Sequence, residues 1–147
     1  MKDYRGTFIT IEGGEGCGKT TQAVQLGQYL ESKGHRVLVT REPGGSPAAE
    51  AIRNILLDPG NNAITPMAEL LLYEAARAQH VEERVRPALD LGQVVICDRF
   101  ADSTMAYQGY GRGLSCDVIG RLNRIASQGV WPDLTIVIDL PANVGLA

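Results

Sequence analysis

Residues 13–20 read Gly-Gly-Glu-Gly-Cys-Gly-Lys-Thr, and this stretch decides the fold. It matches G-x-x-x-x-G-K-[ST], the pattern of a phosphate-binding P-loop. Residues 7–11 before it are β-branched or aromatic, which predicts a strand, and apolar side chains at helical spacing follow in residues 20–33. A strand, a glycine-rich turn and a helix form the context that the motif requires. The alternative is a glycine-rich turn without a ligand, and the flanking strand and helix argue against it.

The residue types of this loop suit phosphate chemistry. Its glycines permit positive φ and a close approach of the backbone to a ligand. Loop N–H groups beside a helix N-terminus form an anion site. Lys19 brings positive charge to the β- and γ-phosphates, and the Thr20 hydroxyl can bind Mg²⁺. We therefore expect one continuous set of residues to bind the nucleotide phosphates: Gly13, Gly14, Glu15, Gly16, Cys17, Gly18, Lys19, Thr20 and Thr21.

The bulk composition is that of a globular protein. The chain has 147 residues, of which 44% are hydrophobic and 21% charged, so we expect one domain spanning residues 1–147. A net charge of −3 and a pI of about 5.4 argue against a nucleic-acid surface. No apolar run approaches the roughly 18 residues of a membrane span, and the N-terminus lacks the apolar core of a signal peptide. We expect no membrane partner.

The cysteines and histidines show no metal or redox spacing. Cys17, Cys97 and Cys116 are scattered and form no C-x-x-C pair, which is typical of reduced thiols in a cytoplasm. His35 and His80 are far apart in sequence, and we expect both at the surface.

Apolar runs alternate with helical patterns along the rest of the chain. Besides residues 7–11, strands are expected at residues 37–40, 94–97 and 134–138. Helices are expected at residues 47–57, 66–78, 80–91 and 115–128. The segment Gly109-Tyr110-Gly111-Arg112-Gly113 is typical of a turn or a mobile loop. The pattern predicts an α/β protein with a parallel sheet that helices cover on both faces.

Functional groups of such a sheet lie at the carboxyl ends of its strands. Asp98 and Asp139 each follow an apolar run, so this position fits both as the acid that helps hold Mg²⁺. Arg99 favours Asp98, because an arginine beside the metal acid can neutralise a phosphate. An Asp–Arg surface pair is the alternative.

Tyr73 and Arg77 are four residues apart, so they share a helix face. A flat aromatic ring and a planar donor on one face could stack on a base and hydrogen-bond to it. Packing of the tyrosine with a solvated arginine is the alternative, and the spacing alone does not choose between the two.

Five segments together carry a resemblance to a known family. They are residues 11–22, 40–45, 73–77, 98–100 and 103–109. With these segments the chain resembles bacterial thymidylate kinase over essentially all of its length. The run Arg41-Glu42-Pro43-Gly44-Gly45 and the pair Asp98-Arg99, at this spacing from the P-loop, are specific in combination.

The resemblance implies a three-layer P-loop kinase fold that transfers a phosphoryl group from ATP to dTMP, giving dTDP and ADP. We expect four parallel strands in the order 2-3-1-4, with the family's fifth strand outside this chain. By position, Lys19, Arg99 and Glu15 would be catalytic, and Thr20 and Asp98 would hold Mg²⁺. Relatives with this fold are usually homodimers.

The resemblance also implies an acceptor site. Tyr73 takes the place of an aromatic residue, often Phe, that covers the thymine ring, and Arg77 would donate to a thymine carbonyl. Thr104 and Gln108 would line the base and sugar pocket.

The remaining acceptor residues would contact the phosphate and sugar. Arg53 and Arg99 would hold the dTMP phosphate. Glu15 would lie near the sugar 3′-hydroxyl and the metal, and Tyr107 would crowd the 2′ position and favour deoxyribose.

The family's chains are longer, with a mobile lid after the strand at residues 134–138. This chain is either a fragment or a natural short form, and we expect it to bind dTMP, turn over slowly and associate. Two other functions stay open: a kinase of similar fold with another monophosphate or small phosphorylated acceptor, and a nucleotide-dependent switch or binding module. The Asn-Lys-x-Asp signature of guanine-specific switches does not occur in the sequence.

Overall fold

The computed structural model describes residues 4–145, which group into two compact units. Residues 4–41, 86–100 and 131–145 form the first, which we name the sheet unit. Residues 42–85 and 101–130 form the second, which we name the helical unit. Each unit is described by itself.

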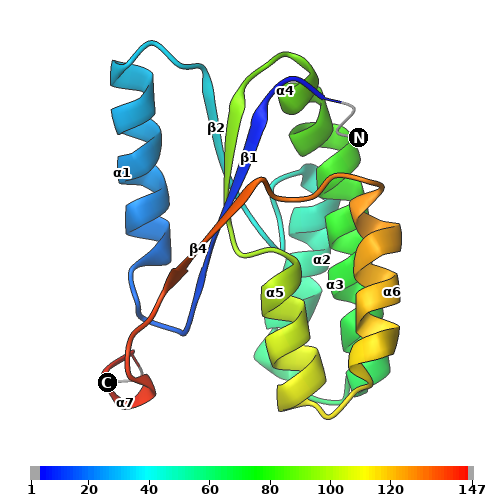
Figure 1. The fold of residues 1–147 in the computed structure, drawn as a ribbon. Coiled ribbons are helices and arrows are strands. Elements are labelled where there is room, and N and C mark those ends of the chain that lie inside the picture. Colours follow the sequence, from blue (N-terminus) through cyan, green and yellow to red (C-terminus); the bar gives the residue numbers. More distant parts are fainter. Residues whose placement is uncertain (1–3, 146–147) are drawn as a thin grey trace. The chain divides into compact units, whose positions relative to one another are not determined.

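Four parallel strands make up the sheet of the sheet unit (Figure 1). They are β1 (Thr7–Gly13), β2 (Val37–Arg41), β3 (Val94–Asp98) and β4 (Leu134–Ile138). Their order is β2-β3-β1-β4, which confirms the expected order 2-3-1-4. All four predicted strands are present, and β1 runs two residues further than expected, to the first glycine of the P-loop.

The register of the sheet separates two sets of buried side chains. Ile9 of β1 lies opposite Ile96 of β3, and Ile11 lies opposite Asp98. Ile11 and Ile96 belong to one apolar cluster on one face of the sheet. Because side chains alternate along a strand, Phe8 points to the other face, where its ring meets that of Phe100 edge-on at 5.1 Å.

Helices of the sheet unit lie on both faces of the sheet. The helix α1 (Lys19–Ser32) packs on β1, β2 and β3, and α4 (Arg86–Asp90) packs on β3. Figure 1 shows them on opposite sides of the strands. Gly27 lets α1 approach closely, since a Cβ there would lie 2.6 Å from Val39 Cγ2.

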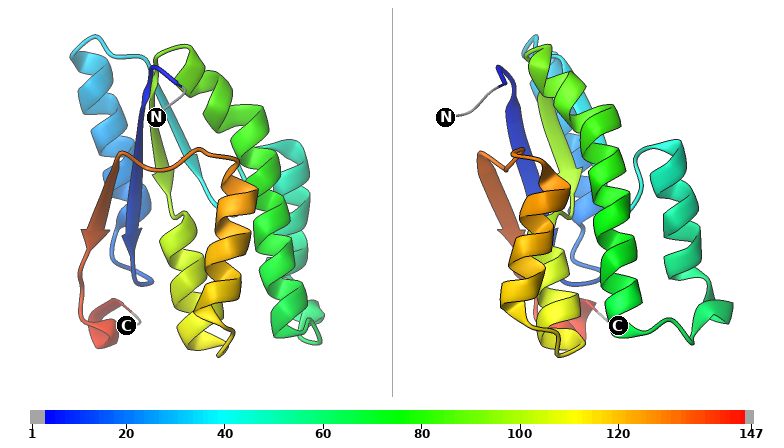
Figure 2. Two further views of the ribbon diagram at one scale, coloured as in Figure 1. Left: turned by 45° about the vertical axis from the view of Figure 1, so that its right-hand side comes forward. Right: turned by 90° about the vertical axis from the view of Figure 1, so that its right-hand side faces the viewer.

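The helical unit contains α2 (Pro47–Leu57), α3 (Pro66–His80), α5 (Ala101–Thr104) and α6 (Cys116–Ser127). The helix α3 lies between α2 and α6 and contacts both (Figure 2). Both α2 and α3 begin at a proline, as predicted from the preceding Ser46 and Thr65.

Two segments differ from their predictions. Residues 109–113 are not all loop, because a π-helical segment, Met105–Gly111, continues α5. Gly109 is buried, and a Cβ there would lie 3.3 Å from Ile119 Cδ1, so this glycine serves packing against α6 as well as chain reversal. The helix expected at residues 80–91 is not separate either: a π-turn at Val81–Val85 joins α3 to α4.

Three short elements complete the described chain: a 3₁₀ turn at Pro59–Asn61, α4 and a four-residue helix α7 (Ala142–Gly145). Within residues 4–145, every helix is too short or too polar to span a membrane.

Candidate active site

The P-loop runs from the carboxyl end of β1 to the first turn of α1. Gly13, Gly16 and Gly18 have φ of 149°, 68° and 87°, values that L side chains adopt at a cost. Gly18 caps α1 in the left-handed conformation. The first N–H groups of a helix have no partner within it, so the loop presents them to a ligand.

Space as well as φ requires glycine in this loop. A Cβ on Gly13 would lie 2.5 Å from the carbonyl oxygen of Ile138, and one on Gly16 would lie 2.1 Å from that of Gly145. The loop therefore passes directly beside the end of β4 and beside Gly145, which lies in the segment after β4.

Lys19 is held inside the loop. The residue is only 6% exposed, and Nζ donates to the carbonyl oxygen of Gly14 and lies 3.6 Å from Cys17 Sγ. Its positive charge is therefore placed beside the backbone that would surround phosphates, as the motif predicts.

Thr20 and Asp98 meet at the carboxyl edge of the sheet. The Thr20 hydroxyl donates to Asp98 Oδ2. Asp98 is the last residue of β3 and is buried, whereas Asp139, the alternative, is exposed. A hydroxyl and a carboxylate offer the oxygen ligands that Mg²⁺ prefers, so this pair fits the metal.

Arg99 follows Asp98 in an unusual conformation. Its φ is 70°, in the left-handed region, and its N–H donates to the carbonyl oxygen of Ile11 at 3.0 Å. The side chain returns to the P-loop: Nη2 donates to Glu15 Oε1 at 2.7 Å and Nη1 to the carbonyl oxygen of Gly13 at 3.2 Å. An exposed ion pair adds little stability, so a strained backbone that places Arg99 here points to function.

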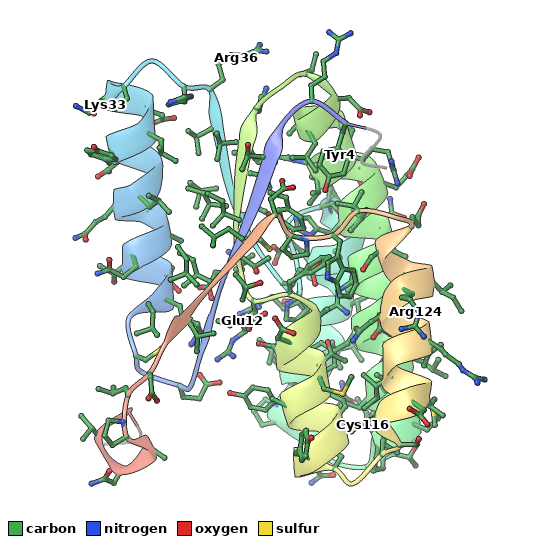
Figure 3. The ribbon with its side chains drawn as sticks, viewed as in Figure 1. Tyr4, Glu12, Lys33, Arg36, Cys116 and Arg124 are labelled. Carbon is green, nitrogen blue, oxygen red and sulfur yellow. The ribbon has the colours of Figure 1, made fainter. Side chains whose placement is uncertain are left out.

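Glu12 supports the same edge, although its sequence position did not single it out. This buried acid lies at the end of β1 (Figure 3), and its Oε1 accepts the N–H of Phe100 at 2.7 Å. It thereby holds the Asp98-Arg99-Phe100 backbone beside the P-loop strand. The sequence feature that could have drawn attention to Glu12 is its place directly before the P-loop glycines.

Arg77 is the centre of a buried polar network in the helical unit. It comes from α3 and is 2% exposed. Its Nε donates to Glu42 Oε2 at 2.8 Å, and Nη2 donates to Thr104 Oγ1 at 2.9 Å. Nη1 donates to Glu74 Oε2 at 3.2 Å and to Asn123 Oδ1. Arg77 is thus bound to protein groups rather than solvated, and its contact with a base stays a prediction.

Two carboxylates in this network differ in their pKa. Burial opposes the ionisation of Glu42, but Arg77 and His80 outweigh it and hold its pKa below the ordinary value. His80 Nδ1 donates to Glu42 Oε1 at 3.0 Å. For Glu74, burial dominates and the nearby Glu42 adds to it, so despite Arg77 its pKa rises to about 7. His80 was expected at the surface, and this is wrong: it is fully buried, because α3 turns it inward beside Arg77.

Arg53 bonds to the quoted motif around Pro43, whereas Gln108 bonds to Glu69, a residue that the sequence did not single out. Arg53 Nη1 donates to the carbonyl oxygen of Pro43 at 2.8 Å. Gln108 Nε2 donates to Glu69 Oε1 at 2.8 Å, and Arg112 Nη2 donates to Glu69 Oε2 at the same distance. Burial opposes ionisation of Glu69, but these hydrogen bonds outweigh it and lower its pKa.

The two predicted aromatic residues lie in the same unit. Tyr73 is half-buried on α3, and Tyr107 is 42% exposed in the π-helical segment after α5. Of the predicted site residues outside the P-loop, Asp98 bonds to Thr20, Arg99 bonds to Glu15 and Gly13, and Arg77 bonds to Thr104.

Several buried polar residues of the helical unit were missed. Glu74 and His80 flank Arg77 on the turns of α3, and helical spacing could have drawn attention to both. Glu42 lies in a quoted motif but had no role, and Asn123 carried no sequence signal.

The chain is similar in sequence to known proteins of one family. A family model for thymidylate kinase matches residues 11–147. A thymidylate kinase of Geotalea daltonii is 63% identical over 141 residues, which are 96% of this chain and 66% of that protein. One of Geobacter sulfurreducens is 62% identical over 142 residues, 97% of this chain and 67% of that protein. This chain therefore spans about two thirds of the length of these curated relatives.

A solved structure gives the same result. The crystal structure of thymidylate kinase from Ehrlichia chaffeensis matches with a TM-score of 0.85 and 44% identity, over 91% of this chain and 75% of that one. The P-loop, the parallel sheet of order 2-3-1-4 and these matches agree. The chain belongs to the thymidylate kinase family.

Proposed function

We propose that the protein transfers a phosphoryl group from ATP to dTMP, giving dTDP and ADP. The observation that carries this proposal is the arrangement around one P-loop. Lys19 lies inside the loop, Thr20 bonds to Asp98, and Arg99 reaches Glu15. Family membership supports the same reaction.

The P-loop is proposed to hold ATP and Mg²⁺. Loop N–H groups and Lys19 would bind the phosphates, and Thr20 and Asp98 would ligate the metal. Bound Mg²⁺ supplies positive charge at the transferring phosphoryl group. Arg99 and Glu15 lie beside the loop, where an arginine can neutralise charge that develops in transfer.

The acceptor dTMP is proposed to contact residues drawn from the family resemblance. Arg99, with Arg53, would bind its phosphate, and Tyr107 would disfavour a ribose. The base and sugar would contact Tyr73, Arg77, Thr104 and Gln108. Support for this part comes from the hydrogen bond between Arg77 and Thr104, two residues expected at the base.

We also propose that residues 1–147 act as one kinase domain in the cytoplasm and that the protein is a homodimer. Cys17, Cys97 and Cys116, all within the described residues, form no disulfide, which suits a reducing compartment. Light scattering during size-exclusion chromatography tests the dimer, and a monomer mass would remove it from the proposal.

Thermal shift with a panel of monophosphates tests the acceptor. A ligand that binds only the native state raises the melting temperature by mass action. We expect dTMP to give the largest shift. Since the thymine methyl can add about 0.8 kcal/mol by burial, dUMP should bind roughly fourfold more weakly. A larger shift with another monophosphate would instead indicate a related kinase with a different acceptor.

A further inference from the structure

The segment Arg41-Glu42-Pro43-Gly44-Gly45 gave the family signal, but Glu42 received no role in the reaction. The structure places its side chain in the interior of the helical unit, with 5% of its surface exposed. Both of its carboxylate oxygens are used: Oε2 accepts from Arg77 Nε at 2.8 Å, and Oε1 accepts from His80 Nδ1 at 3.0 Å. A buried carboxylate with both oxygens paired is fixed in position.

The guanidinium of Arg77 has partners in several directions. Glu42 binds its Nε, Glu74 and Asn123 bind Nη1, and Thr104 binds Nη2. These partners come from the segment after β2, from α3, from α6 and from α5. A planar fork held at each nitrogen cannot rotate without breaking a buried hydrogen bond.

The two carboxylates do not contribute equally. Glu42 makes the shorter bond to Arg77, at 2.8 Å, while Glu74 lies 3.2 Å away. Burial raises the pKa of Glu74 to about 7, so below that pH its carboxyl group is mostly protonated, whereas the pKa of Glu42 is lowered and Glu42 keeps its negative charge beside the guanidinium. The plane of the guanidinium is therefore set mainly by Glu42, and His80 holds Glu42 in turn.

We propose that Glu42 is a positioning residue: it orients the Arg77 guanidinium for hydrogen bonding to the base of the acceptor nucleotide, with His80 as its anchor. The inference rests on the proposed function, in which Arg77 donates to a thymine carbonyl. It adds a residue that acts on base recognition through Arg77 and does not itself touch the substrate.

The test is calorimetric titration of two ligands into Glu42→Ala and Glu42→Gln. One ligand is dTMP, and the other is 2-deoxyribose 5-phosphate, which has the sugar and phosphate but no base. Glu42→Ala leaves Glu74 as the carboxylate on Arg77, so the guanidinium should turn away from its native plane. We expect dTMP affinity to fall about tenfold or more, the loss of one charged hydrogen bond. Affinity for the abasic ligand should change less than twofold.

Glu42→Gln should restore dTMP affinity to within about threefold of wild type. Its amide oxygen can still accept from Arg77 Nε, and its NH₂ can donate to His80 in the other tautomer. The matched control is Glu83→Ala, which removes the same charge from an exposed position of the helical unit, where Gln79 is its hydrogen-bond partner. It should leave both affinities unchanged.

A general loss of structure would lower both affinities in Glu42→Ala by the same factor, and that result overturns the proposal. If Glu42→Ala does not fold, the Nε–H signal of Arg77 in an NMR spectrum of the wild-type protein tests the proposal instead. This signal is assigned by its loss in Arg77→Lys. The signal should move with dTMP and not with the abasic ligand, and a signal unmoved by dTMP also overturns the proposal. Equal binding of both ligands by the wild-type protein would instead contradict base recognition itself, and with it the proposed function.

Discussion

At the scale of single residues, Lys19 is the side chain whose role is most directly testable. It lies at the end of the P-loop, outside the apolar cluster of Ile11, Ala23 and Ile96, and its Nζ donates to the loop carbonyl oxygen of Gly14. Lys19→Ala should therefore leave the melting temperature nearly unchanged. The rate of ADP formation should fall by about 10²–10³, the typical loss for one preorganised charge.

Lys33→Ala is the control for this substitution. Figure 3 shows Lys33 at the end of α1 far from the P-loop, where its ammonium lies 5.4 Å from the centre of the Tyr29 ring. The turnover of the Lys33→Ala variant should match that of the wild-type protein. Near-normal turnover in Lys19→Ala would remove the P-loop from the proposed chemistry.

Glu74 makes the stability of the protein depend on pH. Its pKa is about 7 in the native state against an ordinary value of 4.5, so between these values the folded chain binds a proton that the unfolded chain does not. Stability therefore falls as pH rises through this window, by about 3 kcal/mol. Glu74→Gln removes this loss and should be more stable than wild type at pH 8 but similar at pH 4.

Denaturant unfolding of both proteins at pH 4, 6 and 8 measures the effect. Glu83→Gln, a substitution of an exposed acid, should follow the wild-type curve. Parallel pH dependences for wild type and Glu74→Gln would show that Glu74 does not hold a proton in the folded protein.

The sequence drew attention to polar residues that lie in a local motif, and not to polar residues that distant contacts bury. Asp98 was preferred over Asp139 because Arg99 follows it, and the structure brings Asp98 to Thr20. Glu42 and His80 have no adjacent residue in the sequence that indicates a partner. They bond to each other although they are 38 residues apart. Burial of a charged side chain depends on packing partners that lie far away in the sequence.

At the scale of elements, Gly27 controls how closely α1 packs on the sheet. A helix interior normally gains up to about 1 kcal/mol from Gly→Ala. At Gly27 the new Cβ would lie 2.6 Å from Val39 Cγ2, a β-branched side chain in a strand that cannot turn away freely. Overpacking costs about 1–3 kcal/mol, so Gly27→Ala should destabilise the protein by about 1 kcal/mol.

Gly120 of α6 offers the matched comparison. A Cβ there would meet only Arg124 Nη1, at 3.7 Å, which is ordinary contact. Gly120→Ala should therefore stabilise the protein by up to about 1 kcal/mol. Chemical denaturation measures the change in the free energy of unfolding for both variants, which should be negative for Gly27→Ala and positive for Gly120→Ala. Equal stabilisation by both would contradict the close contact between α1 and β2.

Elements with one clear periodicity were predicted well. The apolar runs gave all four strands, and the prolines after Ser46 and Thr65 marked the starts of α2 and α3. The glycines at 109–113 favoured a loop, yet part of this segment is π-helical, because Gly109 packs against α6. Local propensity of glycine was overridden there by a tertiary contact that the sequence pattern does not reveal.

At the scale of the whole molecule, the sheet order and the family agree. The order β2-β3-β1-β4 places β1, which leads into the P-loop, between β3, which ends in Asp98, and β4. The order was predictable because the motifs fixed a family, whereas the division into a sheet unit and a helical unit follows from packing that no motif encodes.

A phosphoryl-transfer assay with several acceptors tests whether the protein is a kinase that acts on dTMP. ADP formation from ATP is measured with dTMP, dUMP, dCMP, dAMP and dGMP, each over a range of concentrations. We expect the highest kcat/KM with dTMP and a value roughly fourfold lower with dUMP, the difference that one buried methyl group can make. A higher kcat/KM with any other monophosphate, or ADP formation that does not depend on the acceptor, would contradict the proposed function.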